Sequence, residues 1–502
     1  MRKQLVALTL SAAMAAGMLS GCGGYGSGSG GQKDAAEAAA AGTAASTTAA
    51  GSDGTAEPAK ASTADGEPIL IGALYPMTGA LADSGQNMKD GIDLAVEEIN
   101  AAGGISGRPI QIVYGDTQGA NATGMTEMER LITQDKVMAV MGAYQSGVTE
   151  VVSQVAENYQ VPMITANATS DSLTSHGYEY FFRLAPTNMM FIRDMEQYLL
   201  DLSAKDPADD IDVKSVAVCA DNTELGQQTA TWAKYFAEEN GLEFKGEVLY
   251  SQGAADLTSE VLQLKSLNPD ALIVDNYVSD AILLTKTMNE QGYKPNIMIA
   301  KANGYTESSY LPSVGGLANG ILTATEFLPG DKGTKVSDAF KAKYGVDMNG
   351  HSAEAYTVVW IFRTALQNLA DAGKEITSEA LKDELSTLEI KDAFPGGEEI
   401  ILPYDTIKFS ESEFNGIPYK NTNMDGKLTI AQFQDGSLVT VWHRSIKDDG
   451  RKGEQLGAAP PFSFLAIPIA LHFYLYYNNS KTLIGIGGSQ PCYFKADKEV
   501  RE

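Results

Sequence analysis

Short apolar runs alternate with amphipathic stretches along most of the chain, from residue 69 onward. Ile69–Tyr75 is a nearly continuous apolar run, which is typical of a buried parallel strand. In Gln86–Asn100 the apolar residues recur at helical spacing, and Gly103 and Gly104 end the pattern. Further strands are predicted at Ile110–Tyr114, Val137–Met141 and Pro162–Ile164, with helices near 121–134 and 147–159 between them. This βαβ order predicts a doubly wound parallel sheet.

The same order of elements begins again after residue 214. Ser215–Cys219 is a predicted strand, and a helix opens at Gly226, which lies 141 residues after Gly85. The triplet at Gln118–Ala120 recurs at Gln252–Ala254, an offset of 134, and each copy opens a helix that leads into a strand. Two consistent offsets in one order predict two α/β lobes of like topology.

The first 22 residues are typical of an export signal. Arg2 and Lys3 precede a short apolar stretch that ends in small residues. Leu19-Ser20-Gly21-Cys22 resembles a bacterial lipobox, in which Cys22 would be lipidated. The alternative is ordinary secretory cleavage beside an incidental cysteine. Residues 23–66 are mostly Gly, Ala, Ser and Thr, which predicts a disordered tether with a reach of about 35–40 Å.

Charge narrows the possible partners and marks off the end of the chain. The formal net charge is −27, which argues against nucleic acid and against an anionic membrane surface as partners. Residues 67–450 hold 27 basic and 55 acidic side chains, but residues 451–502 hold six and four. This last segment contains an apolar run at 462–477 that Pro468 and His472 interrupt. We expect a poorly ordered tail here; a membrane-spanning helix is the alternative.

Polar and aromatic residues gather in the loops that follow the predicted strands, where open α/β sheets bind their ligands. Lys301 is the only strong cation among them, and the acids are Glu224, Asp275 and Asp280. Such a set suits a small polar or zwitterionic organic molecule better than a phosphate ester. The alternative is that these are ordinary turn residues, since Asn, Ser and Thr are common in turns.

The sequence does not favour an enzyme. No phosphate-binding loop, HExxH motif or CxxC motif is present, and the GxGxxG matches at Gly21–Gly26 and Gly26–Gly31 fall in the signal and the tether. No serine lies in a nucleophile elbow, and Cys219 is most simply a small buried residue. We therefore expect no catalytic residue, no metal and no cofactor.

Four segments together resemble a known family. Gly72–Gly79, Ile99–Ile105, Val161–Thr169 and Phe433–Gly436 are similar, in this order, to the branched-chain amino-acid type of periplasmic solute-binding proteins. The resemblance covers about residues 67–445. It implies a type I periplasmic binding protein fold, with two lobes joined by three crossovers, that acts as the receptor of an ABC importer.

The resemblance also implies a set of ligand-binding residues. Ser146 and Thr169 stand where the family holds the ligand carboxylate, and Tyr277 where it adds a tyrosine. Asn303 replaces the glutamate that pairs with the ligand ammonium, and Ser84 replaces an aromatic residue. The carboxylate end of the site is thus kept, while the ammonium end is weakened. The predicted ligand-binding residues are Ser84, Tyr144, Gln145, Ser146, Asn167, Thr169, Asn222, Tyr277 and Asn303.

The full prediction follows from these features. Lobe 1 is expected over 67–186 with a return over 326–404, and lobe 2 over 187–325 with a return over 405–450. Hinges are expected at Pro186–Asn188, Thr325–Phe327 and Pro403–Asp405. We expect a monomer, lipid-anchored on the extracytoplasmic face, that passes an amino acid or a related amide or carboxylate to ABC permease and ATPase subunits. The alternative is a sensory protein of the same fold that signals through a partner.

Overall fold

The computed structural model describes residues 66–204, 211–443 and 454–455. The predicted signal peptide, Cys22, the tether and nearly all of the tail lie outside the described residues. Within the described ranges, no helix has both the length and the apolar character needed to span a membrane.

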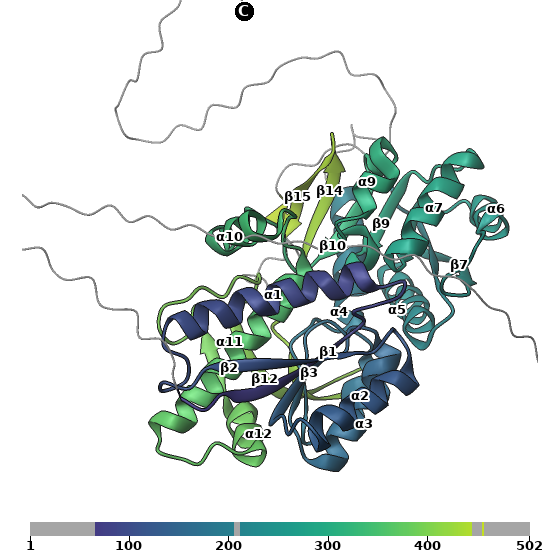
Figure 1. The fold of residues 1–502 in the computed structure, drawn as a ribbon. Coiled ribbons are helices and arrows are strands. Elements are labelled where there is room, and N and C mark those ends of the chain that lie inside the picture. The colour runs from purple at the N-terminus through teal and green to yellow at the C-terminus, as the bar shows by residue number, and fades with distance from the viewer. Residues whose placement is uncertain (1–65, 205–210, 444–453, 456–502) are drawn as a thin grey trace, which may run out of the picture. The chain divides into compact units, whose positions relative to one another are not determined.

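Lobe 1 is built on an eight-stranded sheet with the order β11-β12-β13-β5-β4-β3-β1-β2 (Figure 1). Its strands are β1 (Ile69–Tyr75), β2 (Ile110–Asp116), β3 (Ala139–Gly142), β4 (Met163–Thr165), β5 (Phe181–Arg183), β11 (Glu389–Lys391), β12 (Thr406–Phe414) and β13 (Ile417–Asn423). Its helices are α1 (Ala82–Ala101), α2 (Asn121–Thr133), α3 (Ser146–Tyr159), α10 (Thr334–Tyr344), α11 (Gly350–Asp371) and α12 (Ser378–Thr387). A short 3₁₀ helix covers Asp171–Thr174.

Lobe 2 is built on a second eight-stranded sheet with the order β16-β15-β14-β10-β9-β8-β6-β7. Its strands are β6 (Ser215–Asp221), β7 (Glu243–Tyr250), β8 (Ala271–Asp275), β9 (Ile297–Lys301), β10 (Leu322–Thr325), β14 (Thr429–Gln434), β15 (Ser437–His443) and β16 (Glu454–Gln455). Its helices are α4 (Asn188–Ser203), α5 (Glu224–Asn240), α6 (Thr258–Leu267), α7 (Val278–Glu290), α8 (Ala302–Tyr305) and α9 (Tyr310–Val314).

The internal repeat seen in the sequence is a repeat of topology. The order β5-β4-β3-β1-β2 in one sheet matches β10-β9-β8-β6-β7 in the other. A Cβ at Gly85 would lie 2.1 Å from the carbonyl oxygen of Pro76, and one at Gly226 would lie 1.9 Å from that of Asp221. Both glycines therefore let the helix that follows the first strand of its sheet, α1 or α5, pack closely against the chain at the end of that strand. The prediction of two doubly wound α/β lobes is confirmed.

The chain passes between the lobes three times, and one passage differs from the prediction. The first two follow β5 and β10, at the predicted Pro186–Asn188 and Thr325–Phe327. The third does not lie at Pro403–Asp405, because β12 and β13 belong to the lobe 1 sheet, where Thr422 of β13 pairs with Arg183 of β5. The chain enters the second sheet only at Thr429, so the return to lobe 2 begins about there and not at residue 405.

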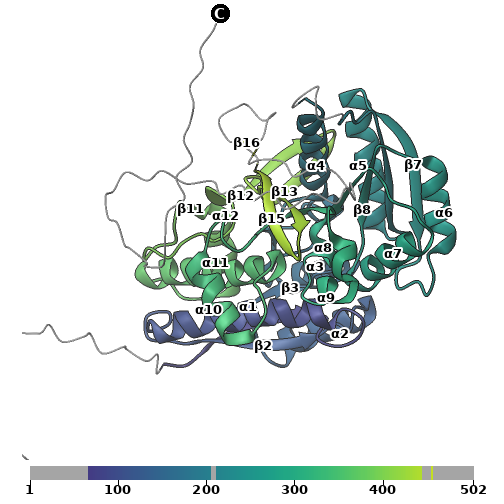
Figure 2. The same cartoon turned by 90° about the horizontal axis from the view of Figure 1, so that it is seen from above.

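Two features of the fold bear on the site and the tail. Helix α11 lies along α1 in both views (Figures 1 and 2), and Asn349 fixes its start by a capping box with Ser352.

Glu454 and Gln455, within the tail that was expected to be poorly ordered, pair with His443 and Trp442 of β15. These two residues thus extend the lobe 2 sheet by a short antiparallel strand.

Candidate functional site

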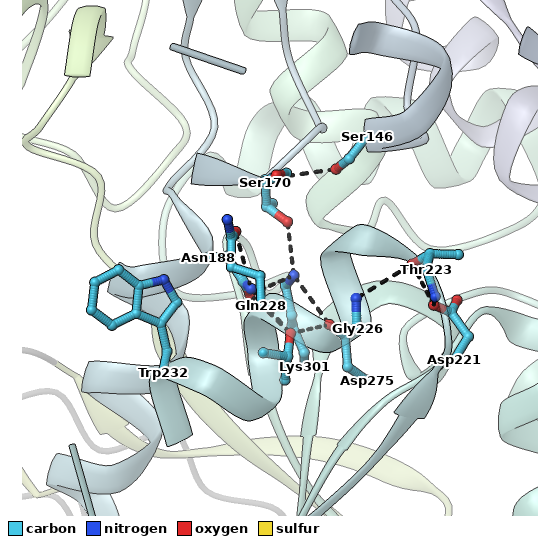
Figure 3. Close-up of polar contacts among 12 residues, drawn as sticks. Ser146, Ser170, Asn188, Asp221, Thr223, Gly226, Gln228, Trp232, Asp275 and Lys301 are labelled. Atoms are coloured by element: carbon cyan, nitrogen blue, oxygen red, sulfur yellow. Dashed lines mark hydrogen bonds and ion pairs between the residues drawn. The ribbon is translucent and has the colours of Figure 1, made fainter. Parts of the chain in front are cut away.

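Lys301, the last residue of β9, joins the two lobes. Its side chain is fully buried, and its Nζ donates hydrogen bonds to Thr169 Oγ1 at 2.7 Å and Asn188 Oδ1 at 3.0 Å (Figure 3). The carboxylate oxygen Oδ2 of Asp275 lies 3.4 Å away. An oxygen therefore stands near Nζ for each of the three N–H groups of the ammonium. Asn188 and Asp275 belong to lobe 2, whereas Thr169 reaches over from lobe 1.

The loop around Ser170 makes a second connection between the lobes. Ser170 Oγ donates to Glu224 Oε2 at 2.8 Å, and the backbone N–H of Asp171 donates to Gln228 Oε1 at 2.8 Å. Both acceptors lie in the first two turns of α5. On the lobe 1 side, the backbone N–H of Ser170 donates to Ser146 Oγ at 3.2 Å (Figure 3). The structure thus has its lobes in direct contact along this loop.

Glu307 makes a third connection, from lobe 2 to α1 and α11. Its Oε2 accepts from Asn87 Nδ2 at 2.6 Å and from Asn349 Nδ2 at 3.2 Å, and its Oε1 lies 2.9 Å from His351 Nδ1. Burial alone would lower the pKa of His351, but the carboxylates of Glu307 and Glu326 raise it above its ordinary value. We therefore treat His351 and Glu307 as a buried ion pair.

Aromatic rings meet between these connections. The rings of Tyr144 and Tyr277, one from each lobe, contact edge to face with centroids 5.7 Å apart, and Tyr144 packs in the same way on His351 at 5.0 Å. Tyr144 has a φ of 75°, a conformation that costs a bulky residue roughly 1–3 kcal/mol and is concentrated at ligand sites. Burial raises the pKa of its phenol, so the hydroxyl keeps its proton.

Several buried polar atoms around Tyr144 lack a hydrogen-bond partner. The hydroxyls of Tyr144 and Ser84 face each other, but neither completes a hydrogen bond. Gln145 Oε1 and Asn167 Oδ1 also have no partner, and both side chains are more than nine-tenths buried. Such an atom destabilises a protein by about 1–3 kcal/mol unless something bonds to it. Four of the predicted ligand-binding residues therefore have hydrogen-bonding capacity to spare.

Two further carboxylates are buried beside this group. Glu326 directly follows β10 and Glu354 lies in α11, where its Oε2 accepts from Asn167 Nδ2 at 2.9 Å. Burial raises the pKa of both carboxyl groups, and the nearby Glu326 raises that of Glu354 further. Glu326 Oε2 and Glu354 Oε1 have no hydrogen-bond partner, although the hydroxyl of Tyr404 faces Glu354.

The structure brings most of the predicted site residues together, with two exceptions. Asn222 is exposed, and its Oδ1 accepts from Gln227 Nε2 of its own lobe at 2.9 Å, so it lies apart from the buried group. Asn303 is in α8, but its side chain lies outside the described part of the chain. The other seven residues are buried: Ser84, Tyr144, Gln145, Ser146, Asn167, Thr169 and Tyr277.

Sequence reasoning missed the charged residues of the site. Lys301 was noted as a cation but not as a site residue, and Glu307, Glu326, His351 and Glu354 were not singled out. A usable signal existed for Glu354, which lies between two alanines just before the apolar run at 358–362. Glu326 likewise follows directly on a buried strand. A charge within an apolar run is expensive to bury without a partner, and it therefore points to a site.

One hollow that Glu307 lines lies at the lobe boundary. A groove of about 420 Å³ runs beside Glu307 and Asn349 and is walled by apolar side chains that include Leu311, Phe327 and Met348. None of the nine predicted ligand-binding residues lines it. Within the described ranges, no group of three or more His, Cys, Asp and Glu residues is arranged to hold a metal ion.

Comparisons with known proteins agree on one family. A family model described as periplasmic binding protein matches residues 68–406. The chain is 31% identical over 392 residues to Leu/Ile/Val-binding protein homolog 7 of Brucella suis, covering 74% of this chain and 91% of that one. Among solved structures, the branched-chain amino acid transporter substrate-binding protein LivJ of Streptococcus pneumoniae, in complex with isoleucine, matches with a TM-score of 0.61 at 24% identity. That match covers 74% of this chain and 100% of LivJ. A solute-binding protein of Rhodopseudomonas palustris in complex with benzoate matches with the same TM-score at 16% identity, covering 76% of this chain and 98% of that one.

Proposed function

Because the chain belongs to the periplasmic binding protein family, whose members bind solutes and are not enzymes, we propose that it captures an amino acid or a related small amide or carboxylate between its lobes and delivers it to an ABC importer. The family also implies an extracytoplasmic location. The compounds in the relatives' names or complexes all carry a carboxylate: Leu, Ile and Val in one case, and isoleucine and benzoate in the others. A carboxylate is therefore the ligand group for which we look first.

One observation carries the proposal: the hydroxyls of Ser146 and Thr169 each already accept a hydrogen bond from the protein. Ser146 accepts from the backbone of Ser170, and Thr169 accepts from Lys301. An accepted bond orients the hydroxyl so that its own hydrogen points elsewhere, and it can then donate to a ligand oxygen. The ammonium of Lys301, 2.7 Å from Thr169 Oγ1, favours negative charge at that place. This arrangement suits a carboxylate.

The cellular setting extends the proposal. We expect Cys22 to carry a lipid and residues 23–66 to hold the lobes away from the membrane, as the lipobox-like sequence and the composition support. A monomer that presents both lobes to permease and ATPase subunits is the simplest assembly with this fold.

A ligand screen by thermal unfolding tests the function. The panel contains amino acids, their amides, and small aliphatic and aromatic carboxylates. A ligand that binds only the folded protein stabilises it by RT ln(1+[L]/Kd), about 2.7 kcal/mol at a hundredfold excess over Kd. We expect one subset of related compounds to raise the unfolding midpoint. No response to any carboxylate or amide, at millimolar concentration and with a folded sample, would contradict the proposed ligand class.

A further inference from the structure

We infer that the captured solute carries a protonated amino group, and that the carboxylates of Glu326 and Glu354 hold it together with the amide oxygen of Asn167. The inference rests on the proposed function, because it specifies a second group of the same solute. In the family this amino group is expected to meet a glutamate in the loop after β9, where this chain has Asn303. The inference instead places the negative charge at the second crossover and near the start of α11.

The position of the two carboxylates follows from the fold. Glu326 begins the crossover after β10, and Glu354 lies in the second turn of α11. A Cβ at Gly350 would lie 2.4 Å from Glu326 Oε2, so this carboxylate lies directly against the first turn of α11. Asn167 joins the same group from lobe 1, since its Nδ2 donates to Glu354 Oε2 at 2.9 Å and to the carbonyl oxygen of His351 at 3.2 Å.

While both glutamates are ionised, the atoms without a partner in this group can only accept hydrogen bonds. They are Glu326 Oε2, Glu354 Oε1 and Asn167 Oδ1, from side chains that are at most 6% exposed. A group that satisfies all three must supply several donors, and a protonated amine has three N–H groups. Hydrogen bonds to charged groups are also the stronger ones, so an ammonium is favoured over a neutral amide.

The basic groups nearby are already engaged. Lys301 is bonded to Thr169 and Asn188 and paired with Asp275, and the ring of His351 is held by Glu307. Glu307 itself accepts from Asn87 and Asn349 as well. Glu326 and Glu354 thus remain close together with raised pKa values. An added cation would stabilise their charged forms, because it offsets both their mutual repulsion and the loss of hydration on burial.

The two proposed ends of the site share one loop of lobe 1. Asn167, at the acidic end, and Thr169, at the Lys301 end, are two residues apart in one loop. Two residues of chain span at most about 7 Å. The side chains proposed to meet the ammonium and the carboxylate are therefore attached to the backbone within about 7 Å of each other.

Matched pairs of ligands test the inference. Calorimetric titrations compare leucine with 4-methylpentanoate, isoleucine with 3-methylpentanoate, and phenylalanine with 3-phenylpropanoate, so each pair differs only in the amino group. We expect at least one amino acid to bind, with its partner at least tenfold weaker. Glu326→Gln and Glu354→Gln should each weaken the amino acid at least tenfold and change the binding of the carboxylate partner by less than twofold.

Glu196→Gln is the matched control, because Glu196 is also a fully buried glutamate without a hydrogen-bond partner, but it lies in the core of lobe 2 on α4. It should leave both ligand series unchanged, and circular dichroism verifies that all three variants are folded. The inference is overturned if the carboxylate partners bind as tightly as the amino acids or more tightly. It is also overturned if the glutamine variants lose affinity equally for both series. Either result leaves the proposed function standing. Binding of no compound of either series would also overturn the inference, and it would contradict the proposed function only if the thermal screen likewise finds no carboxylate or amide that binds.

Discussion

Replacing Thr169 with valine separates ligand affinity from folding stability. The substitution keeps the shape of the side chain and removes the hydroxyl that accepts from Lys301 at 2.7 Å. A hydrogen bond to a charged group contributes about 1.5–3 kcal/mol. Because this bond joins lobe 1 to lobe 2, we expect it to form only when the lobes are closed. Its removal should therefore destabilise the closed state relative to the open state. At 1.4 kcal/mol per decade, we expect Thr169→Val to weaken ligand binding about 10- to 100-fold.

The control is Asn188→Ala, which removes another partner of Lys301 at 3.0 Å but within lobe 2. Both partners lie in lobe 2, so we expect this bond to persist when the lobes open. The variant should lower the free energy of unfolding by about 1–3 kcal/mol and change affinity less than threefold. Calorimetric titration gives the affinities, and urea denaturation of the ligand-free proteins gives the stabilities. The reasoning is refuted if Thr169→Val changes affinity less than twofold, or if Asn188→Ala weakens binding as much as Thr169→Val does.

Four further predictions follow from other parts of the chain. Cys22→Ala should abolish fatty-acid labelling and move the protein out of the membrane fraction; a labelled variant in the membrane would contradict the anchor. Removal of residues 456–502, which keeps β16, should leave the unfolding midpoint within a few degrees, and insoluble protein would show that this segment stabilises the lobes. Solution scattering should give a smaller radius of gyration with ligand than without, and identical curves at saturation would count against lobe closure. Burial raises the pKa of Asp221 from 3.8 to about 6, so the folded state holds this proton more tightly than the unfolded chain does. Its contribution to stability should therefore fall by up to about 3 kcal/mol as pH rises from about 4 to 6. The difference in free energy of unfolding in urea between wild type and Asp221→Asn should follow this fall, and a difference that does not change with pH would contradict the reasoning.

The sequence predicted the parts of the fold that local pattern controls. Buried parallel strands are apolar runs, and the paired glycines Gly85 and Gly226 mark a close approach that recurs in both lobes. The sheet to which β12 and β13 belong was predicted wrongly for a physical reason. An antiparallel hairpin with alternating polarity fits the edge of either sheet, and only the contact of β13 with β5, some 240 residues earlier in the chain, decides between them.

The candidate site was predictable only in part, for a similar reason. Loops at the carboxyl ends of parallel strands identify Ser146, Asn167 and Thr169, because topology places them together. The partner of Thr169 could not be found in this way, since Lys301 lies 132 residues further on and its long side chain was free to point elsewhere. The pairing of Asn167 with Glu354, 187 residues away, likewise depends on how α11 packs on lobe 1.

In the proposed site, the loop from Asn167 to Asp171 uses Asn167 for solute recognition alone, Ser170 and Asp171 for joining the lobes, and Thr169 for both. Ser170 Oγ donates to Glu224 and the Asp171 carboxylate accepts from Trp232, both on α5 of lobe 2, and Thr169 bonds to Lys301. A substitution at any of these three should therefore shift the equilibrium between open and closed lobes. Asn167 faces Glu354 within lobe 1. Evolution, or an engineer building a sensor for a different solute, can therefore vary residues around Asn167 and Glu354 to change the preferred compound while the lobes continue to open and close as before.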